Sequence, residues 1–397
     1  MKEFIAVIGL GYVGLPLATA AAKSGYTVIG VDLNIEKIIK INSGISPIED
    51  IKSSEIRDLV ERGLLKAVSD YSAIKGADVI LICVPTPLTS DHQPDLTYLE
   101  SAANSISNNF SNGSLLILES TVAPGTTRNF LAPLIANGSG IDIVDLDIVF
   151  SPERIDPLNQ KWNLKNTPKI ISGLTSKSRK RAVDFYSKFV DIVIEYKEVE
   201  VVETAKLLEN SFRLVNISFI NELSIFCQKL GININDVISA ASTKPYGFMP
   251  FYPSIGIGGH CIPVDPLYLA NKAKEVGAPS KMIELADQIN QEMPGYFVGR
   301  AEEKIGGLKD KKVLVIGVSY KSNVADVRET PVEALILGLK NKGAAVFWHD
   351  DLVKEWNGEK SVALSSEYEL AILATPHDYL DLTKLGDVPI LNTRGSI

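Results

Sequence analysis

Short apolar runs alternate with helical stretches along the first part of the chain. Four of these runs are Phe4–Ile8, Tyr26–Val31, Val79–Val84 and Leu115–Leu118, and an alanine-rich stretch to about Ser24 follows the first. The third and fourth runs lack the polar alternation of a half-exposed strand, which is typical of a parallel sheet covered on both faces. The pattern therefore predicts repeated strand–helix units around a parallel sheet.

The period becomes helical between about Val199 and Gly231, where no proline or internal glycine interrupts the chain, and a second helical stretch covers about Ser280 to Ile305. Polar side chains recur on one face of the first helix at steps of three and four residues, namely Glu203, Lys206, Asn210 and Arg213. Periodicity alone favours a solvated face for this stripe. A wholly helical segment between two sheet domains is also suited to subunit pairing.

Strands return after residue 305. The apolar runs Lys312–Gly317, Ala345–Trp348 and Glu369–Ala374 are separated by polar loops and by a helix that ends at about Lys342. This repeats the strand–helix alternation of the first part, and a chain of 397 residues is long enough for two or three domains.

A glycine motif connects the first strand to the first helix. Gly9, Gly11 and Gly14 form GxGxxG, and Asp32 ends the next strand eighteen residues after Gly14. In a dinucleotide site these glycines give a tight turn, close approach of the pyrophosphate and close helix–strand packing, while the acid meets the ribose hydroxyls. A carboxylate would repel the 2′-phosphate of NADP, so the pattern favours NAD. The alternative is a glycine-rich turn without a ligand.

The predicted fold is α/β, with two Rossmann-like doubly wound parallel-sheet domains joined by a central helical domain that contains a long helix. We place an NAD-binding domain at 1–198, the helical domain with the cysteine loop and the dimer contact at 199–305, and a second Rossmann-like domain at 306–397. Ligands bind beyond the carboxyl ends of such strands. The expected cofactor-binding residues are Gly9, Gly11, Tyr12, Val13, Gly14, Asp32, Lys37, Val84, Pro85, Thr86, Ser120 and Thr121. For the hydroxyl residues among them, the alternative is a turn-forming role.

A cysteine lies in the glycine-rich segment Gly256–Pro266, with an acid four positions later. Cys261 is a candidate nucleophile because glycines allow substrate and backbone amides to approach closely. The alternative is a buried cysteine followed by an ordinary helix start, with Asp265 as N-cap. Further along, Lys321 and Arg328 follow a strand and could hold a nucleotide diphosphate, although surface positions are the default for both.

Composition narrows the class of protein. With 45% hydrophobic and 22% charged residues and a net charge of −8, the chain is predicted to be globular, with no nucleic-acid or anionic-membrane surface. The three cysteines form no CxxC pair, as expected in a reducing compartment, and Cys83 and Cys227 lie in apolar segments that predict core positions. No apolar run approaches the length of a membrane span and no signal-type segment is present, so we expect a cytoplasmic protein. The four histidines lack metal-ligand spacing, and no metal site is expected.

Together these motifs resemble the UDP-glucose/UDP-mannuronate dehydrogenase family over essentially the whole chain. The resemblance rests on GxGxxG with Asp32, on Val84–Pro87, Ser120–Thr127 and Ser151–Arg154, on the Lys206/Asn210 helix, on Gly258–Cys261 with Asp265, and on Tyr320–Lys321. It implies that the primary alcohol of a UDP-sugar is oxidised to a carboxylate with two NAD⁺ in succession. The substrate-binding residues it implies are Glu153, Arg154, Lys206, Asn210, Lys244, Tyr252, Gly258, Gly259, Tyr320, Lys321 and Arg328.

The resemblance also implies catalytic roles. Cys261 forms a thiohemiacetal and then a thioester, and Lys206 and Asn210 stabilise charge on oxygen. Asp265 assists a water molecule or tunes the site. Glu153 is the implied general base for thioester hydrolysis, with Thr121 positioning the water.

Two departures from the UDP-glucose pattern favour the branch of the family that acts on UDP-N-acetylhexosamines. Pro157 stands where a second acid is usual, and His260 stands where a serine is usual. We therefore expect UDP-GlcNAc as substrate, with UDP-ManNAc, UDP-GalNAc and UDP-glucose as alternatives. The aromatic segment Tyr246–Tyr252 could cover the uracil and the acetamide, although packing explains aromatic clusters more often. Lys244 could reach a phosphate, including one bound in a neighbouring subunit.

Two further functional hypotheses remain open. A single-step β-hydroxyacid-type dehydrogenase would explain Lys206 and Asn210 but has no use for Cys261 or for a third domain. A non-catalytic nucleotide-binding paralogue would keep the pocket without turnover. A homodimer or higher homo-oligomer through the central helical domain is expected.

Overall fold

The computed structural model describes residues 3–48, 50–155, 159 and 161–395. The chain forms two compact units, Met1–Leu208 and Glu209–Ile397, each with its own main sheet. The long helix α7 (Val199–Lys229) begins in the first unit and ends in the second. The domain boundaries expected at residues 198 and 305 stay a prediction.

The first unit contains an eight-stranded sheet in the order β3-β2-β1-β4-β5-β6-β7-β8. The strands are β1 (Phe4–Ile8), β2 (Thr27–Val31), β3 (Leu65–Val68), β4 (Val79–Ile82), β5 (Leu115–Leu118), β6 (Asp147–Phe150), β7 (Lys169–Gly173) and β8 (Val193–Tyr196). Neighbouring strands are parallel except β6 and β7, which are antiparallel. Because β1 lies between β2 and β4, the strand order reverses at β1, and a ligand crevice is expected beyond the carboxyl ends of β1 and β4.

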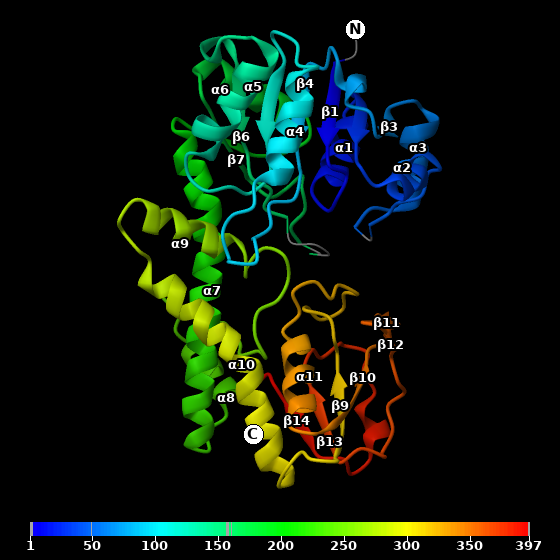
Figure 1. Ribbon diagram of the computed structural model, residues 1–397, viewed down its shortest axis with the longest axis vertical. Coiled ribbons are helices and arrows are strands. Elements are labelled where there is room, and N and C mark those ends of the chain that lie inside the picture. The colour runs from blue at the N-terminus through cyan, green and yellow to red at the C-terminus, as the bar shows by residue number, and fades with distance from the viewer. Residues whose placement is uncertain (1–2, 49, 156–158, 160, 396–397) are drawn as a thin grey trace. The chain divides into compact units, whose positions relative to one another are not determined.

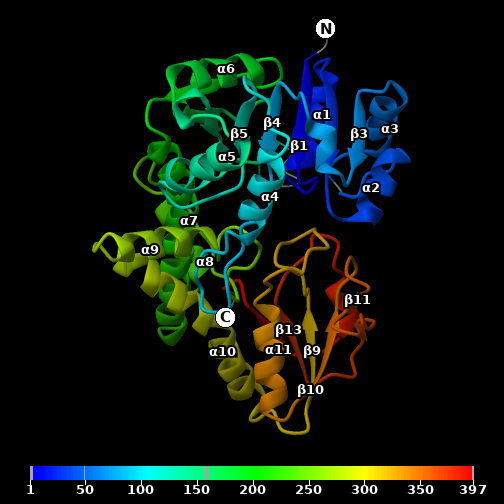
Figure 2. The same cartoon turned by 45° about the horizontal axis from the view of Figure 1, so that its top comes forward.

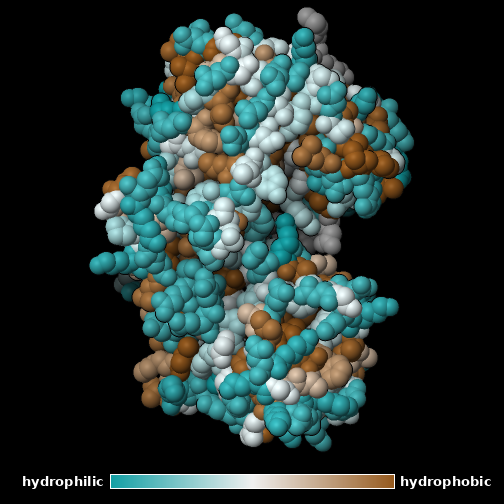
Figure 3. Space-filling view, in the orientation of Figure 1, coloured by the Kyte–Doolittle hydropathy of each residue, from teal (hydrophilic) through white to brown (hydrophobic). Residues whose placement is uncertain are grey.

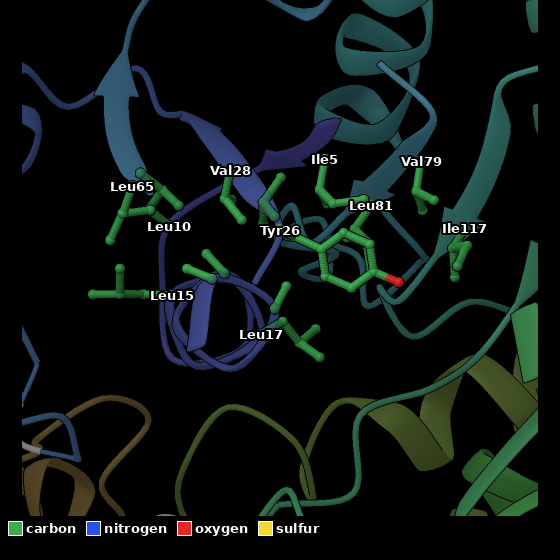
Figure 4. Packing of buried hydrophobic residues seen from close by; sticks show 14 of the residues in the cluster. Ile5, Leu10, Leu15, Leu17, Tyr26, Val28, Leu65, Val79, Leu81 and Ile117 are labelled. Atoms are coloured by element: carbon green, nitrogen blue, oxygen red, sulfur yellow. The ribbon is translucent and has the colours of Figure 1, made fainter. Parts of the chain in front are cut away.

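Helices cover both faces of this sheet, which explains why its central strands β1, β4 and β5 are apolar throughout (Figures 1 and 2). These helices are α1 (Gly14–Lys23), α2 (Ile35–Asn42), α3 (Ser53–Glu61), α4 (Thr97–Ser107), α5 (Ala132–Ser139) and α6 (Ser176–Tyr186). Side chains of α1, α2, α3 and α6 pack on one face, and those of α4, α5 and the start of α7 pack on the other. Figure 4 shows Leu15 and Leu17 of α1 beneath the strand residues Ile5, Val28 and Leu81.

The second unit contains a smaller sheet in the order β10-β9-β13-β14, all parallel. Its strands are β9 (Lys312–Ile316), β10 (Ala345–His349), β13 (Leu370–Leu373) and β14 (Ile390–Asn392), and β11 (Glu355–Trp356) pairs separately with β12 (Glu359–Lys360). The helices are α8 (Ile234–Ser242), α9 (Asp265–Glu275), α10 (Lys281–Ile305) and α11 (Val332–Asn341). Side chains of α10 and α11 cover one face, and loop residues with the short helix Leu382–Leu385 cover the other.

The predicted fold class is confirmed: two Rossmann-like sheets and a helical region with a long helix are present. On the face shown in Figure 3, hydrophilic side chains predominate, with apolar patches between them. Within the described part of the chain, no helix is both long and apolar enough to cross a membrane.

Candidate active site

The loop Gly9–Gly14 between β1 and α1 has the geometry that the GxGxxG motif predicts. Gly9 has φ +89°, and a Cβ there would lie 2.6 Å from the carbonyl oxygen of Cys83. A Cβ on Gly14 would lie 1.8 Å from the Gly9 carbonyl oxygen, whereas a Cβ on Gly11 meets no atom within 4 Å. Gly9 and Gly14 are therefore required by backbone packing. Gly11 faces open space, as expected where a pyrophosphate approaches the backbone.

Asp32 lies just beyond β2, and its carboxylate is held by two backbone hydrogen bonds and an ion pair. Its carboxylate accepts hydrogen bonds from the backbone N–H of Leu10 (2.8 Å) and of Asn34 (2.9 Å), and it pairs with Lys37 Nζ at 2.7 Å. Burial alone would raise the pKa of Asp32, but these hydrogen bonds hold it below its ordinary value. Asp32 therefore stays ionised and ties the strand end to the glycine loop. The sequence did not predict the direct contact with Lys37.

The other expected cofactor residues follow β1, β4 and β5. Ser120 Oγ donates to the Val84 carbonyl (2.7 Å), which links the ends of β4 and β5. Thr86 and Ser120 are buried, Val13, Val84 and Thr121 are half-buried, and Tyr12 and Pro85 are exposed. These residues and the glycine loop belong to neighbouring strand ends of one sheet. Their roles toward a cofactor stay predictions.

A buried cluster of charged side chains lies where β5, β6 and β7 meet. Glu119 follows β5, Glu153 follows β6, and Lys169 begins β7, with Tyr186 of α6 beside them. Lys169 Nζ lies 2.9 Å from Glu119 Oε2 and 3.5 Å from Glu153 Oε2, and it sits over the Tyr186 ring, 4.9 Å from its centroid. The Tyr186 hydroxyl donates to Glu119 Oε1. Burial raises the pKa of Glu119 to about 7 despite the lysine.

Glu153 is held from two directions. Its Oε1 accepts hydrogen bonds from the backbone N–H of Arg154 (2.6 Å) and of Ile155 (2.9 Å), while its Oε2 faces Lys169. Arg154 Nη1 donates to the Pro168 carbonyl at 2.8 Å. The sequence analysis named Glu153 and Arg154 but missed Glu119, Lys169 and Tyr186. The available signal was a lysine at the start of an otherwise apolar strand.

The polar stripe of α7 is not a simple solvated face. Glu203 is fully buried, and its carboxylate accepts hydrogen bonds from the backbone N–H of Gly125 (2.6 Å) and of Thr127 (2.9 Å). Burial raises the pKa of Glu203 to about 7. The solvated-face interpretation is therefore wrong at this position, because the loop after β5 supplies two N–H groups that need an acceptor. Lys206, one helical turn further along, is half-buried.

In the second unit, the candidate nucleophile is accessible and an ordered acid follows it. Cys261 is exposed, and its carbonyl accepts a hydrogen bond from the Asp265 N–H at 2.8 Å. Asp265 is buried, and Asn210 Nδ2 of α7 donates to its carboxylate at 2.6 Å. Helix α9 begins at Asp265 itself and its N-cap is Val264, so the alternative interpretation of Asp265 as N-cap is wrong. The structure thus brings Asn210 and Asp265 together, four residues from Cys261.

The glycine loop that carries Cys261 packs against the segment after β9. A Cβ on Gly258 would lie 2.6 Å from the Glu329 carbonyl oxygen, and one on Gly259 would lie 2.8 Å from the Tyr320 ring. Gly259 N–H donates to the Arg328 carbonyl at 3.2 Å. These glycines are needed because two backbone segments meet here, a reason that the sequence did not show.

A buried asparagine of α10 fixes the start of the same loop. Asn290 Oδ1 accepts from Ile257 N–H at 2.5 Å, and its Nδ2 donates to the Ile257 carbonyl at 3.4 Å. Sequence reasoning missed Asn290, which had no signal beyond a polar residue inside a helix.

The remaining predicted residues have different surroundings. Arg328 pairs with Asp326 through Nη2 at 2.5 Å, and Lys321 is half-buried in the same segment. Lys244 and Tyr252 are exposed, and Lys244 Nζ lies over the Tyr246 ring at 5.1 Å from its centroid. Burial and then the charge of Arg328 lower the pKa of His260. Pro157, used above to choose the substrate branch, lies outside the described residues.

The cysteines differ in burial. Cys227 is buried, as predicted. Cys83 is half-buried against the first core cluster rather than within it, because the chain leaves β4 just before it. Across the described ranges, no group of three or more His, Cys, Asp and Glu side chains is arranged to hold a metal ion.

The first unit thus carries a dinucleotide fingerprint at the point where its strand order reverses, and the second carries an exposed thiol beside an ordered carboxylate. The fingerprint and the fold of the first sheet define a class of NAD-binding dehydrogenases. The NAD-binding domain model of a known family matches residues 3–190, its central domain matches 200–292, and its UDP-binding domain matches 314–391.

Relatives with assigned names are similar to this chain over most of its length. A protein from Pyrococcus horikoshii named UDP-N-acetyl-D-mannosamine dehydrogenase is 35% identical over 379 residues, which cover 94% of this chain and 89% of the relative. One from Salmonella typhi named UDP-N-acetyl-D-glucosamine 6-dehydrogenase is 33% identical over 386 residues, with 94% and 89% covered. Both relatives thus match nearly the whole chain.

Solved structures show the same likeness. The Pyrococcus horikoshii UDP-D-ManNAc dehydrogenase superposes with a TM-score of 0.91 at 33% identity and covers 99% of this chain and 95% of that one. A UDP-glucose dehydrogenase from Pyrobaculum islandicum gives 0.90 at 26% identity, with 99% and 94% covered. The chain belongs to the UDP-glucose/GDP-mannose dehydrogenase family, and it is an NAD-dependent oxidoreductase of the nucleotide-sugar dehydrogenase class.

Proposed function

We propose that this protein oxidises the 6-hydroxymethyl group of a UDP-N-acetylhexosamine to the carboxylate in two oxidation steps, the second of which takes place on a covalent adduct with Cys261. The observation that carries the proposal is the exposed thiol of Cys261 in a loop fixed on both sides, one turn before a buried carboxylate. A single-step dehydrogenase has no use for this thiol. The relatives named above support the nucleotide-sugar class of substrate.

The proposed reaction converts the alcohol to the acid through an aldehyde and a thioester. In the first step the alcohol loses a hydride and a proton and becomes an aldehyde, and bound NAD⁺ supplies the hydride acceptor in both oxidations. The Cys261 sulfur adds to the aldehyde carbon and a proton goes to the aldehyde oxygen, which forms a thiohemiacetal. This adduct loses a second hydride and its hydroxyl proton to become a thioester. Water then attacks the carbonyl carbon, the carbon–sulfur bond breaks, and the acid leaves.

Four other groups serve these steps in our proposal. Lys206 and Asn210 stabilise negative charge on the reacting oxygen, as preorganised donors do. Glu153 accepts the proton of the attacking water, with Thr121 positioning that water. Asp265 orients Asn210, to which it is bonded at 2.6 Å. In the C-terminal part, Tyr320, Lys321 and Arg328 hold the uridine diphosphate.

The decisive experiment is the ratio of NADH formed to UDP-sugar consumed at completion. Purified protein is given NAD⁺ and, separately, UDP-GlcNAc, UDP-ManNAc, UDP-GalNAc and UDP-glucose. Two NADH per sugar are expected with an N-acetyl sugar, and the sugar with the highest rate names the substrate. One NADH per sugar would favour the single-step dehydrogenase, and none with any of the four would favour the binding paralogue.

A cysteine pair tests the covalent step. Cys261→Ser should abolish acid formation, whereas Cys227→Ser, in the core of the second unit, should keep two NADH per sugar. Acid formation by the Cys261 variant at the normal rate would refute the thioester. A covalent sugar adduct seen by intact-protein mass spectrometry in the parent protein, and absent from that variant, is the positive result.

We also infer that two copies associate through α7. From its middle to the residue that follows its end, α7 exposes a stripe of large apolar side chains, Phe212, Phe219, Phe226 and Leu230, each 48–58% exposed and spaced by seven or four residues. That spacing places them along one face of the helix, and an apolar face of this kind is typical of a helix that pairs with another. Phe219→Glu should convert a dimer to a monomer in light scattering after size exclusion. A parent protein that is monomeric at micromolar concentration would refute the inference.

A further inference from the structure

Glu119, Glu153, Lys169 and Tyr186 form a buried cluster with more charged and polar side chains than a general base such as Glu153 requires. Lys169 is 4% exposed and Glu119 2% exposed, yet both are ionisable side chains at the ends of interior strands. Burying an ion pair seldom adds stability over an apolar pair of the same size. The cluster therefore calls for a role beyond holding β5 and β7 together.

The contacts of Glu153 point to that role. Its Oε1 is bonded to two backbone N–H groups, whereas its Oε2 is buried, accepts no hydrogen bond from the described residues, and faces Lys169 Nζ at 3.5 Å. Lys169 also binds Glu119 at the shorter distance of 2.9 Å. Two carboxylates thus share one ammonium group, and the nearer one competes with Glu153 for it.

The groups that face this cluster come from every element packed around it. Cys83 follows β4, Glu119 follows β5, Glu153 follows β6, Lys169 begins β7, and Tyr186 ends α6. Burial and the nearby carboxylates raise the pKa of the Cys83 thiol and of the Tyr186 hydroxyl, so neither carries charge near neutral pH. The remaining ionisable groups of the cluster are one lysine and two acids, and Lys169 Nζ contacts both carboxylates.

We propose that Lys169 and Glu119 are positioning residues that set the proton affinity of Glu153. This inference rests on the proposed role of Glu153 as the base in thioester hydrolysis. Lys169 keeps Glu153 ionised and ready to accept the proton of the attacking water. When Glu153 takes that proton, Lys169 remains paired with Glu119 at 2.9 Å, so no ammonium group is left buried without a counter-charge.

The test is the pH dependence of thioester breakdown. The protein is mixed with NAD⁺ and UDP-GlcNAc or UDP-ManNAc, quenched in acid at intervals, and the covalent sugar adduct is followed by intact-protein mass spectrometry. Lys169→Met should move the acidic limb of the breakdown rate upward by about one to three pH units, since an opposite charge at this range lowers a carboxyl pKa by that much. Lys169→Arg should return the acidic limb of the breakdown rate to its position in the parent protein.

The companion variant Glu119→Gln breaks the same ion pair but should leave the limb in place or move it downward, because it removes a negative charge. A structural role would move both variants in the same direction. The double variant Lys169→Met with Glu119→Gln removes both the Lys169 ammonium and the Glu119 carboxylate. It should therefore fold even if the lysine variant alone does not. The acidic limb of its breakdown rate should lie at higher pH than that of Glu119→Gln.

Controls separate this inference from the proposed function. Arg181→Met breaks another ion pair of the first unit, between Arg181 of α6 and Asp147 of β6 at 2.6 Å, and should leave the limb unchanged. Glu153→Gln should accumulate the adduct. If that variant breaks down the adduct at the normal rate, the base assignment is wrong. If Glu153→Gln accumulates adduct but the lysine variants share the limb of the parent protein, only the inference about Lys169 and Glu119 is overturned.

Discussion

The buried carboxylate of Glu203 should make the folded state less stable as the pH rises. Its pKa is raised to about 7 in the folded protein, against an ordinary 4.5. The folded state then binds this proton more tightly than the unfolded state does, so the stabilisation is complete below pH 4.5 and is lost as the pH rises to about 7. At about 1.4 kcal/mol per pKa unit, the loss amounts to about 3 kcal/mol, most of it between pH 5 and pH 8.

Glu203→Gln removes the ionisable carboxyl group and keeps one oxygen that can accept a hydrogen bond. The amide oxygen can serve either the Gly125 or the Thr127 N–H, and the other N–H loses its partner at a pH-independent cost of about 1–3 kcal/mol. The variant should therefore be the less stable protein at pH 5, and the difference should shrink by about 2–3 kcal/mol by pH 8. Because Glu119 titrates in both proteins, its contribution cancels.

Urea unfolding followed by far-UV circular dichroism at pH 5, 6, 7 and 8 measures this difference. Glu200→Gln is the matched control, since Glu200 lies three residues earlier on α7 and pairs with Arg128 near the surface. The Arg128 hydrogen bond lowers the pKa of Glu200, so its pH dependence falls below this window. A Glu203 difference that stays constant, or that grows with pH, would show that the two N–H groups hold the carboxylate ionised, and would refute the reasoning.

Four further substitutions test the site. Gly14→Ala should destabilise the protein by about 3 kcal/mol in thermal or urea unfolding, because its Cβ overlaps the Gly9 carbonyl. Gly11→Ala should fold normally and raise the KM for NAD⁺ about tenfold. Equal stability losses in the two variants would contradict this reasoning. Asn290→Ala, which frees the Ile257 N–H, should lower kcat while NAD⁺ affinity measured by calorimetry stays unchanged. Lys37→Met, which removes the Asp32 ion pair, should weaken NAD⁺ binding, and unaltered binding would argue against a cofactor role for this pair.

The sequence by itself determined the elements and the cofactor fingerprint of this protein. Continuous apolar runs predicted the strands because both faces of a parallel sheet are buried, and glycine spacing after β1 predicted the loop because only glycine fits its turn and its contact with α1. The long helix was equally visible, because no helix breaker interrupts residues 199–229. Local chemistry decides these features, so local sequence suffices to predict them.

Tertiary structure alone decided how the candidate residues are held. Glu203 belongs to a polar stripe in the sequence, yet it is buried because the loop after β5 brings two N–H groups to it. Lys169 became the neighbour of Glu119 because β7 runs antiparallel to β6, which places its first residue beside the ends of β5 and β6. Such contacts join residues separated by fifty or more positions, and spacing along the chain carries no information about which distant groups will meet.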